Sequence, residues 1–524
     1  MKRTENLKQL QSGDKVWDIA IIGGGSSGFG VAIDALSRGL SVVLLEKSDF
    51  GKGTSSRSTK LLHGGVRYLA QGDIRLVYEA LSERGNLLKA APHLTSVKRF
   101  VIPVYSLLDR LKYTAGLKIY DLMSGKLRIG RSRFTDREDT IKRLPGIKQE
   151  GLDGGVIYHD GQFDDTRMLI ALARTCADMG GCLLNYCGVT DLRKDGDGKV
   201  AGLSAKDEIS GAEIEVKAKM VVNATGVFAD QILQMDKPGA AKSIRPSQGI
   251  HLVFDTDFLG GEDALMIPET SDGRVLFAVP WLGKLVVGTT DTLRESPDTD
   301  PRALEEEVDF VLKTAGEYLA KKPKRSDVRS VFAGLRPLAA PKEGRTMTKE
   351  ISRSHRVIVS DSHLVSIVGG KWTTFRKMGE DTVKAFAEVT GTQLPEVSRP
   401  IDRLHGYTLE KDGHFDAYGS DAAEIKAMAA QKPEWAEKLH PNHPYLAAEV
   451  VWAVRNEMAV NVEDVLSRRT RLLILDARAA LEAAPKVAEL MAAELGENGT
   501  WVEDRLKEFA KTATAHTITP DEKN

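Results

Sequence analysis

The 524-residue sequence is poor in cysteine, in net charge and in long hydrophobic runs. Only Cys176, Cys182 and Cys187 occur, which are too few and too close together for a disulfide framework or a four-ligand zinc site. We therefore predict buried, reduced thiols and no metal centre. The net charge is −1, so no overall field attracts nucleic acid, and we expect no nucleic-acid partner.

No stretch reaches the roughly 18 continuous apolar residues that a membrane-spanning helix requires. The sequence begins MKRTENLKQLQSGDK, which lacks the apolar centre of a signal peptide. We therefore expect a cytoplasmic protein that is not exported. The chain is too long for one simple core, which predicts two or three domains.

The most informative segment is DIAIIGGGSSGFG, at residues 18–30. An apolar run predicts a buried parallel strand, and a helical pattern follows the motif Gly23-x-Gly25-x-x-Gly28. Gly23 permits a tight turn, Gly25 lets the backbone approach a pyrophosphate, and Gly28 lets the helix pack close to the strand. The free N–H groups and positive dipole end of the helix favour phosphates. This segment predicts a dinucleotide site.

An acidic residue follows at the expected distance. A second apolar strand, Val42–Leu45, ends at Glu46, which is 18 residues after Gly28. A carboxylate at this position can hold the ribose hydroxyls of an adenosine. A glycine-rich turn without a ligand is the alternative, but the two strands, the helix and the acid together favour a bound dinucleotide.

Two later segments favour FAD over NAD. Strand patterns in MVVNATGVFAD (Met220–Asp230) and HLVSIVGGKWTTFRK (His363–Lys377) also end in glycine-containing turns. A flavin dinucleotide is long and touches several separated strand ends, whereas a nicotinamide dehydrogenase usually keeps its fingerprint in one contiguous domain. For Ala224–Gly226 taken alone, an ordinary strand end is the alternative.

The order of patterns predicts an α/β fold. We expect a Rossmann-type FAD-binding domain, like that of glutathione reductase or amino-acid oxidases, with an interleaved antiparallel-sheet substrate domain and a C-terminal helical domain. The expected parts are the FAD-binding domain in three pieces (1–100, 151–242 and 346–390), a basic amphipathic segment (101–150), a substrate-binding cap (243–345) and the helical domain (391–524).

Several cations and histidines fall in segments that should meet near the flavin. An excess of cations beside a redox cofactor suits an anionic substrate, in particular a phosphate. Any single one is also explained as a solvated, salt-bridged or structural residue, so the prediction rests on the group. Its members are His63, Arg67, His251, Arg336, Lys349, Lys371 and Arg376.

The motifs together resemble the FAD-dependent, aerobic, quinone-linked glycerol-3-phosphate dehydrogenase family. The matching segments occur in family order over nearly the whole chain: IGGGSSGFGVAIDALSRG, SSRSTKLLHGGVRYL, YHDGQFDDTRMLIALA, NATGVFAD, SQGIHLVF, GLRPL, GGKWTTFRK and RRTRLLILDARAA. The sequence departs from the family at Phe29 (usually small), Phe375 (usually Tyr), Met378 (commonly Ala) and Lys349 (often Arg). The last change replaces a bidentate phosphate contact with a point charge.

The resemblance implies oxidation of sn-glycerol 3-phosphate to dihydroxyacetone phosphate, with electrons passing through FAD to a membrane quinone. It implies substrate-binding cations at Arg67, Arg336, Lys349 and Lys371. The implied catalytic residues are His251, His63 and Arg336. Because an arginine cannot act as a base at ordinary pH, we favour a histidine as the base, His251 over His63.

The expected FAD contacts come from the fingerprint, the acidic strand end, the Thr/Ser-rich loop that follows it and the two later glycine turns. They are Gly23, Gly24, Gly25, Ser26, Ser27, Gly28, Glu46, Lys47, Thr54, Ser55, Ser56, Ser58, Thr59, Ala224, Gly226, Gly369, Gly370, Lys371 and Thr373.

The segment Ser106–Arg133 mixes leucines with seven cations and only two acids. Such a segment can lie in a membrane interface with its cations toward anionic lipid. A helix packed on its own domain is the alternative. With the resemblance, we expect peripheral association with the inner face of the cytoplasmic membrane, where a quinone is reached, and a homodimer is one expectation for the assembly.

Three other functions stay open. The first is a glycerol-3-phosphate oxidase that passes electrons to oxygen; such relatives tend to carry an internal insertion, and none is obvious here. The second is a related FAD-dependent enzyme of the amine or amino-acid oxidase type. The third is a flavin-carrying scaffold without turnover, which the full set of histidines and arginines disfavours.

Overall fold

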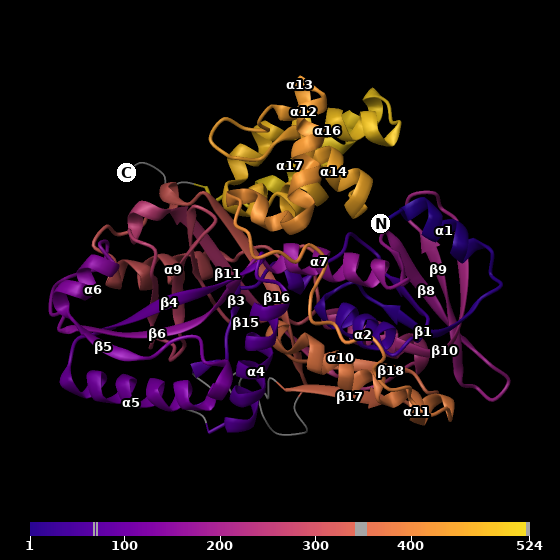
Figure 1. Cartoon of the computed structure of the whole chain (residues 1–524), viewed down its shortest axis with the longest axis horizontal. Coiled ribbons are helices and arrows are strands. Elements are labelled where there is room, and N and C mark those ends of the chain that lie inside the picture. Colours follow the sequence, from indigo (N-terminus) through magenta and orange to yellow (C-terminus); the bar gives the residue numbers. More distant parts are fainter. Residues whose placement is uncertain (67–68, 70–71, 341–353, 520–524) are drawn as a thin grey trace.

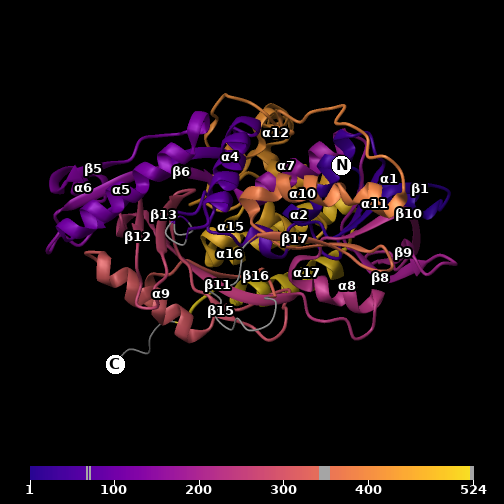
Figure 2. The ribbon, with the colours of Figure 1, turned by 90° about the horizontal axis from the view of Figure 1, so that it is seen from below.

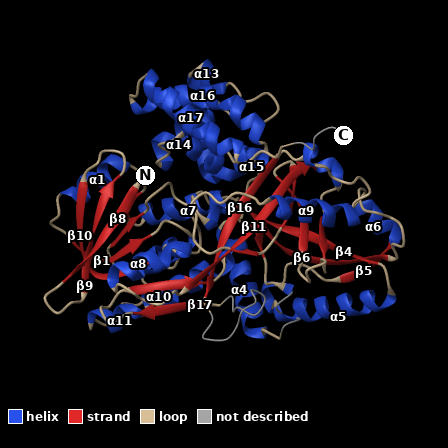
Figure 3. Cartoon of the chain, turned by 180° about the vertical axis from the view of Figure 1, so that it is seen from behind, coloured by secondary structure: helices blue, strands red, loops and turns tan. Residues whose placement is uncertain are grey.

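The computed structural model describes residues 1–66, 69, 72–340 and 354–519. Two β-sheets lie side by side, and a helical domain covers one edge of both (Figure 1). Figure 3 shows that the C-terminal domain contains helices and loops in its described part, while the strands belong to the other two bodies. The predicted α/β fold with a C-terminal helical domain is confirmed.

The first sheet carries the predicted nucleotide fold. Its order is β17-β18-β10-β1-β2-β7, and β1 pairs in parallel with both β2 and β10. Buried Val, Ile and Leu side chains dominate β1 and β2, as expected for strands covered on both faces. The strands are β1 (Val16–Ile22), β2 (Val42–Leu45), β7 (Cys182–Leu184), β10 (Glu213–Asn223), β17 (His355–Val359) and β18 (Val365–Gly369), with β8 (Cys187–Lys194) and β9 (Val200–Asp207) continuing from β10.

Helix α2 (Ser26–Ser37) follows β1 and is almost wholly buried. It crosses α10 (Phe375–Val383) so closely that a Cβ on Gly30 would lie 2.4 Å from the Phe375 carbonyl oxygen. Its other neighbour is α7 (Asp165–Asp178). Around this sheet lie α1 (Arg3–Gln11), α8 (Ala229–Asp236) and α11 (Ala385–Thr390), and Figure 2 shows α2, α10 and α11 from below. Helix α4 (Ile74–Ala90) packs between the turn Trp372–Thr374 and the second sheet.

The second sheet has the order β15-β11-β14-β13-β12-β4-β6-β3, with β16 paired to β11 and β5 to β6. Residues 243–345 supply the antiparallel strands β11 to β16, and four strands from earlier in the chain complete the sheet. The strands are β3 (Leu61–Leu62), β4 (Thr95–Val104), β5 (Arg133–Asp136), β6 (Gly154–Phe163), β11 (Ile244–Asp255), β12 (Ala264–Ile267), β13 (Leu276–Trp281), β14 (Lys284–Gly288), β15 (Thr292–Leu293) and β16 (Ser330–Ala339).

The helices beside the second sheet include α5 (Leu107–Met123), α6 (Arg137–Arg143) and α9 (Glu305–Tyr318). Helix α5 lies on the outer rim beside β5 and β6 (Figure 2). None of the helices in the described residues is long and apolar enough to cross a bilayer.

The C-terminal helices pack around a core of alanine, leucine and valine. They are α12 (Ala422–Gln431), α13 (Pro433–Ala436), α14 (Ala447–Glu457), α15 (Leu472–Leu475), α16 (Ala477–Leu495) and α17 (Gly499–Thr514). Between α14 and α15 a single π-helical turn, Asp464–Arg469, carries two buried arginines toward the first sheet. The three cysteines are buried and free, as predicted.

Candidate active site

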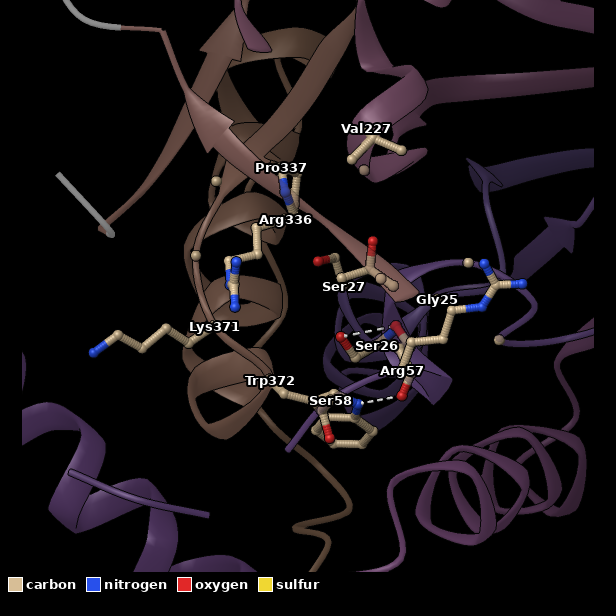
Figure 4. Close-up of a pocket in the computed structure, with 18 of the residues that line it drawn as sticks. Gly25, Ser26, Ser27, Arg57, Ser58, Val227, Arg336, Pro337, Lys371 and Trp372 are labelled. Carbon is tan, nitrogen blue, oxygen red and sulfur yellow. Dashed lines mark hydrogen bonds between the residues drawn. The ribbon is translucent and has the colours of Figure 1, made fainter. Parts of the chain in front are cut away.

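A cavity of about 810 Å³ lies between the two sheets and is lined by residues from both. The first sheet contributes the fingerprint loop and two later strand ends, and the second contributes β11, β13 and β16. Figure 4 shows Gly25, Ser26 and Ser27 on one side of this cavity and Arg336 and Pro337 on another.

The fingerprint glycines have the backbone geometry that the spacing predicts. Gly23 has a φ of +109°, and a Cβ there would lie 2.7 Å from the Ala224 carbonyl oxygen. A Cβ on Gly28 would lie 2.0 Å from the Gly23 oxygen. At Gly25, which faces the cavity, a Cβ would meet only the Ser55 Oγ, at 3.2 Å. Gly23 and Gly28 thus shape the turn, and Gly25 leaves the backbone open to the cavity.

Glu46 ends β2 with its carboxylate held toward the turn. It accepts hydrogen bonds from the backbone N–H groups of Gly24 at 2.7 Å and Ser48 at 2.9 Å. Burial raises its pKa, and these two backbone donors partly oppose that shift. The carboxylate lines the cavity 18 residues beyond Gly28, where an adenosine ribose is expected.

The three glycine-containing strand ends converge. β18, β10 and β1 are adjacent parallel strands, so their carboxyl ends meet at one edge of the sheet. The turn after β18 places Gly369 and Gly370 at φ values of +77° and +91°, followed by Lys371 at the start of the Trp372–Thr374 turn.

Most of the predicted cofactor residues line the cavity. Those that do are Gly23, Gly25, Ser26, Ser27, Glu46, Lys47, Thr54, Ser55, Ser58, Thr59, Ala224, Gly226, Gly369, Gly370, Lys371 and Thr373. Gly24, Gly28 and Ser56 are not among the lining residues, and the contacts above show that Gly24 and Gly28 shape the loop from behind.

Of the predicted catalytic and substrate residues, His63, His251, Arg336 and Lys371 line the same cavity. Arg67 and Lys349 lie outside the described residues. Arg376 was expected near the flavin and is absent from the lining; it forms an ion pair with Glu83 of α4 at 2.6 Å. Its carboxylate partner comes from a distant segment, which the local motif does not reveal.

Arg336 extends from β16 across the neighbouring strand β11. Its Nη1 donates to the Gln248 carbonyl oxygen at 3.3 Å, and its Nη2 donates to Thr289 Oγ1 and the Thr290 carbonyl oxygen, each at 3.1 Å. Asp291 forms an ion pair with it at 3.5 Å. The guanidinium is therefore fixed against the loop 289–291 on the cavity wall.

His251 lies on β11, which pairs with the strand of Arg336, β16, and it is 2% exposed. Its Nε2 shares a hydrogen bond of 2.9 Å with Thr59 Oγ1, and its ring stacks on Phe332 with centroids 4.8 Å apart. Burial, and then the positive charges of Lys60 and Arg336, hold its pKa well below the ordinary value. The imidazole is consequently neutral at neutral pH, with one of its two ring nitrogens unprotonated.

A buried ionic group supports the loop that carries Thr59. Lys60 donates to the Ser56 carbonyl oxygen at 2.8 Å and to Asp165 at 2.7 Å, and Arg471 from the helical domain donates to the same carboxylate at 2.9 Å. Burial lowers the pKa of Lys60 to about 8, although Asp165 opposes this shift. The C-terminal domain thereby reaches the loop beside His251.

Comparison with known proteins gives a consistent result. A family model described as FAD dependent oxidoreductase matches residues 18–376, and one described as the C-terminal domain of alpha-glycerophosphate oxidase matches residues 362–505. The mitochondrial glycerol-3-phosphate dehydrogenase of Homo sapiens is 38% identical over 548 residues, which cover 98% of this chain and 74% of the human protein.

A solved structure agrees. The glycerol-3-phosphate dehydrogenase from Bacillus halodurans, complexed with FAD, is 29% identical, with a TM-score of 0.81 and coverage of 100% of this chain and 99% of that one. This chain belongs to the FAD-dependent glycerol-3-phosphate dehydrogenase family. The L-alpha-glycerophosphate oxidase of Mycoplasma pneumoniae is 17% identical with a TM-score of 0.57, so it shares the fold.

FAD is the cofactor of this family member, and the cavity fits it. The open approach at Gly25, the start of α2 and the carboxylate of Glu46 suit a pyrophosphate and a ribose in sequence. Gly369 and Gly370, at another strand end, offer backbone to a more distant part of a long ligand.

Three of the four departures from the family pattern are buried side chains that change packing, and one of them, Met378, also lines the cavity. Phe29 is fully buried and meets Phe50 edge-on at 5.4 Å. Phe375 packs against Trp372 at 5.3 Å, and Met378 fills the space beside Gly370, where a Cβ would lie 2.5 Å from its sulfur.

Sequence reasoning missed residues that act from a distance. The support of Arg336 by the loop 289–291, the Lys60–Asp165 pair and the reach of Arg471 all join segments remote in the chain. The only available sequence signals were the buried-strand contexts of Thr289–Asp291 and the cluster of arginines at 468–471.

Proposed function

We propose that this protein oxidises sn-glycerol 3-phosphate to dihydroxyacetone phosphate and passes the electrons to a membrane quinone. The observation that carries the proposal is the juxtaposition, on paired strands of one cavity, of a neutral buried histidine and a fixed arginine. A base and an anion-binding group are what oxidation of a phosphorylated alcohol requires.

FAD, held by the residues around Gly25, Glu46 and Gly370, would supply the acceptor for the hydride that leaves C2 of the substrate. His251 accepts the proton of the C2 hydroxyl, and its Nε2 lies 2.9 Å from Thr59 Oγ1. Arg336 and Lys371 hold the negative charge of the substrate, together with Arg67 and Lys349. His63, near Phe277 with ring centroids 6.5 Å apart, is the second histidine of the site.

The route to a quinone is proposed through α5. Its outer face exposes Leu107, Leu108, Leu111, Ile119 and Leu122 to between 52% and 78%, while Leu117 and Tyr120 pack inward. Apolar side chains this exposed, interleaved with cations, are typical of a helix that lies in a membrane interface. We propose that this face binds the inner surface of the cytoplasmic membrane; a homodimer stays a prediction.

Oxygen is the alternative electron acceptor, because the C-terminal family model takes its description from alpha-glycerophosphate oxidase. A peroxide assay separates the two during turnover. Stoichiometric peroxide identifies an oxidase, whereas peroxide near background with fast reduction of a soluble quinone analogue supports the dehydrogenase.

The substrate proposal is tested at Arg336. Arg336→Ala removes one charged hydrogen-bonding group, worth about 1.5–3 kcal/mol, so kcat/KM for glycerol 3-phosphate should fall roughly ten- to hundredfold. Activity on glycerol, which has no phosphate, should change far less. Equal kcat/KM values on the two alcohols in the unchanged enzyme would contradict the proposal.

A further inference from the structure

Arg336 is held by backbone and side-chain groups that are themselves held by one buried carboxylate. Glu307 lies in the first turn of α9 and is 3% exposed. Its Oε1 accepts hydrogen bonds from Thr290 Oγ1 at 2.8 Å and Thr292 Oγ1 at 2.6 Å. Its Oε2 accepts from Gln248 Nε2 at 2.7 Å and from the Leu304 backbone N–H at 3.1 Å.

Two of these four donors belong to residues whose carbonyl groups bind Arg336. The Gln248 carbonyl oxygen accepts from Nη1, and the Thr290 carbonyl oxygen accepts from Nη2. Gln248 lies on β11, and Thr290 follows β14. The Glu307 carboxylate therefore joins two chain segments, one of which binds Nη1 of the guanidinium and the other Nη2. Gly249 completes the arrangement, since a Cβ there would lie 2.4 Å from Arg336 Nη2.

The groups around Glu307 leave little freedom to replace it. Thr290 Oγ1 also accepts the backbone N–H of Ile250 at 3.0 Å, so its hydroxyl hydrogen is committed to Glu307. Gln248 Nε2 also donates to the Arg302 carbonyl oxygen at 2.8 Å. An acceptor with two oxygens satisfies all four donors, whereas a glutamine would turn an N–H group toward at least one of them.

We propose that Glu307 is a positioning residue that sets the place of the Arg336 guanidinium and thereby the affinity of the site for the substrate phosphate. The proposal rests on the proposed function, in which Arg336 binds an anion. Glu307 itself is turned away from the substrate: its four hydrogen bonds end on protein groups, and it is absent from the residues that line the cavity.

The test compares Glu307→Gln with Glu306→Gln in the FAD-loaded enzyme. Glu306 is in the same helical turn and is exposed, so its variant carries the same change of charge without touching the contacts of Arg336. For Glu307→Gln we expect a KM for glycerol 3-phosphate at least tenfold higher, a kcat within about threefold of the unchanged enzyme, and an unchanged flavin content. Glu306→Gln should leave all three unchanged.

A second readout is independent of turnover. Inorganic phosphate should perturb the flavin absorbance of the oxidised enzyme, and its dissociation constant should rise at least tenfold in Glu307→Gln. In the double variant with Arg336→Lys the two losses should not add, because both act through one guanidinium. Phosphate bound equally well by Glu307→Gln and the unchanged enzyme, or fully additive losses, would overturn the positioning role.

The two readouts separate this inference from the proposed function. If the unchanged enzyme binds phosphate but does not oxidise glycerol 3-phosphate, the proposed function fails while the phosphate comparison still decides the role of Glu307. If Glu307→Gln does not fold, Thr292→Val removes one donor to Oε1 and should give a smaller rise in the phosphate dissociation constant; no rise in that variant contradicts the inference.

Discussion

Two basic segments of this chain have opposite surroundings. In the segment 468–471 the three arginines are each 1% exposed and bind Asp49, Glu463, Asp464, Glu457 and Asp165. In α5 the cations face solvent among leucines that are more than half exposed. The first segment joins two domains, whereas the second exposes a row of apolar side chains to solvent.

The difference teaches that composition alone does not decide what a basic segment does. The buried arginines are explained by carboxylates far away in the chain: Asp49 is 420 residues from Arg469. Burying a charge is costly unless it is paired and hydrogen-bonded, so each arginine is buried only where such a carboxylate is present. For α5, the exposed leucines instead support the proposed contact with the apolar interior of a membrane.

The largest expected effect comes from breaking the buried segment. Arg469 donates to both oxygens of Asp49, at 2.6 and 2.9 Å, and both side chains are fully buried. Arg469→Ala leaves that carboxylate with a reduced set of partners and should lower the free energy of unfolding by about 3–5 kcal/mol. Urea denaturation followed by flavin fluorescence measures it. A loss below 1 kcal/mol would show that the interface does not depend on this pair.

A smaller effect on folding, but a large one on lipid binding, is expected at α5 and the turn that follows it, Gly125–Leu127. Replacing Lys112, Lys118, Lys126 and Arg128 with Gln should weaken binding to anionic vesicles by about 1 kcal/mol per cation, and salt should weaken binding of the unchanged protein. Stability should change by no more than about 0.5 kcal/mol per site. Vesicle cosedimentation and thermal unfolding give the two values.

The control is activity with a soluble electron acceptor, which should stay nearly intact because these four residues are absent from the cavity lining. Vesicle binding that survives the four changes, or a protein that unfolds because of them, would assign α5 to the folded core and require another surface for the quinone.

The smallest expected effect on stability concerns His405, a partly buried histidine between two carboxylates. His405 lies between Asp178 at 2.6 Å and Asp421 at 3.0 Å, joining α7 to the start of the helical domain. Burial lowers its pKa, but the two carboxylates outweigh this, so the pKa is raised above its ordinary 6.5. The resulting stability is fully present below about pH 6.5 and is lost as the pH rises through the folded-state pKa.

His405→Gln should therefore destabilise the protein more at pH 6 than at pH 8.5, by about 1 kcal/mol or less. His440→Gln is a suitable comparison, because its partner Glu482 is 69% exposed. Equal losses at the two pH values for His405→Gln would mean that charge on this histidine does not hold the domains together.

Local patterns predicted which residues of the first sheet line the cavity. The turn at Gly23–Gly28, the acid at Glu46 and the two later glycine turns are each encoded within about a dozen residues of a strand, and parallel pairing of their strands brings them together. Arg336 and His251 were found because they occur in motifs, and the structure brings both to the cavity. The roles of Arg67 and Lys349 stay predictions.

The rest of the site depends on contacts between segments that are far apart in the sequence, which no local pattern contains. The strands β4 and β6 join the second sheet from positions before residue 243, because β4 pairs with β12. Lys60 and Asp165 meet across 105 residues, and Glu307 reaches Gln248 across 59. Each contact brings together polar groups that are ordinary in sequence and become informative only when both are buried.

The central claim is that glycerol 3-phosphate delivers electrons to the flavin of this enzyme, and an anaerobic spectrum tests it most directly. Glycerol 3-phosphate added to the oxidised, oxygen-free protein should bleach the flavin band near completion, and the same concentration of glycerol should leave it almost unchanged. A flavin band that stays oxidised with glycerol 3-phosphate would contradict the account.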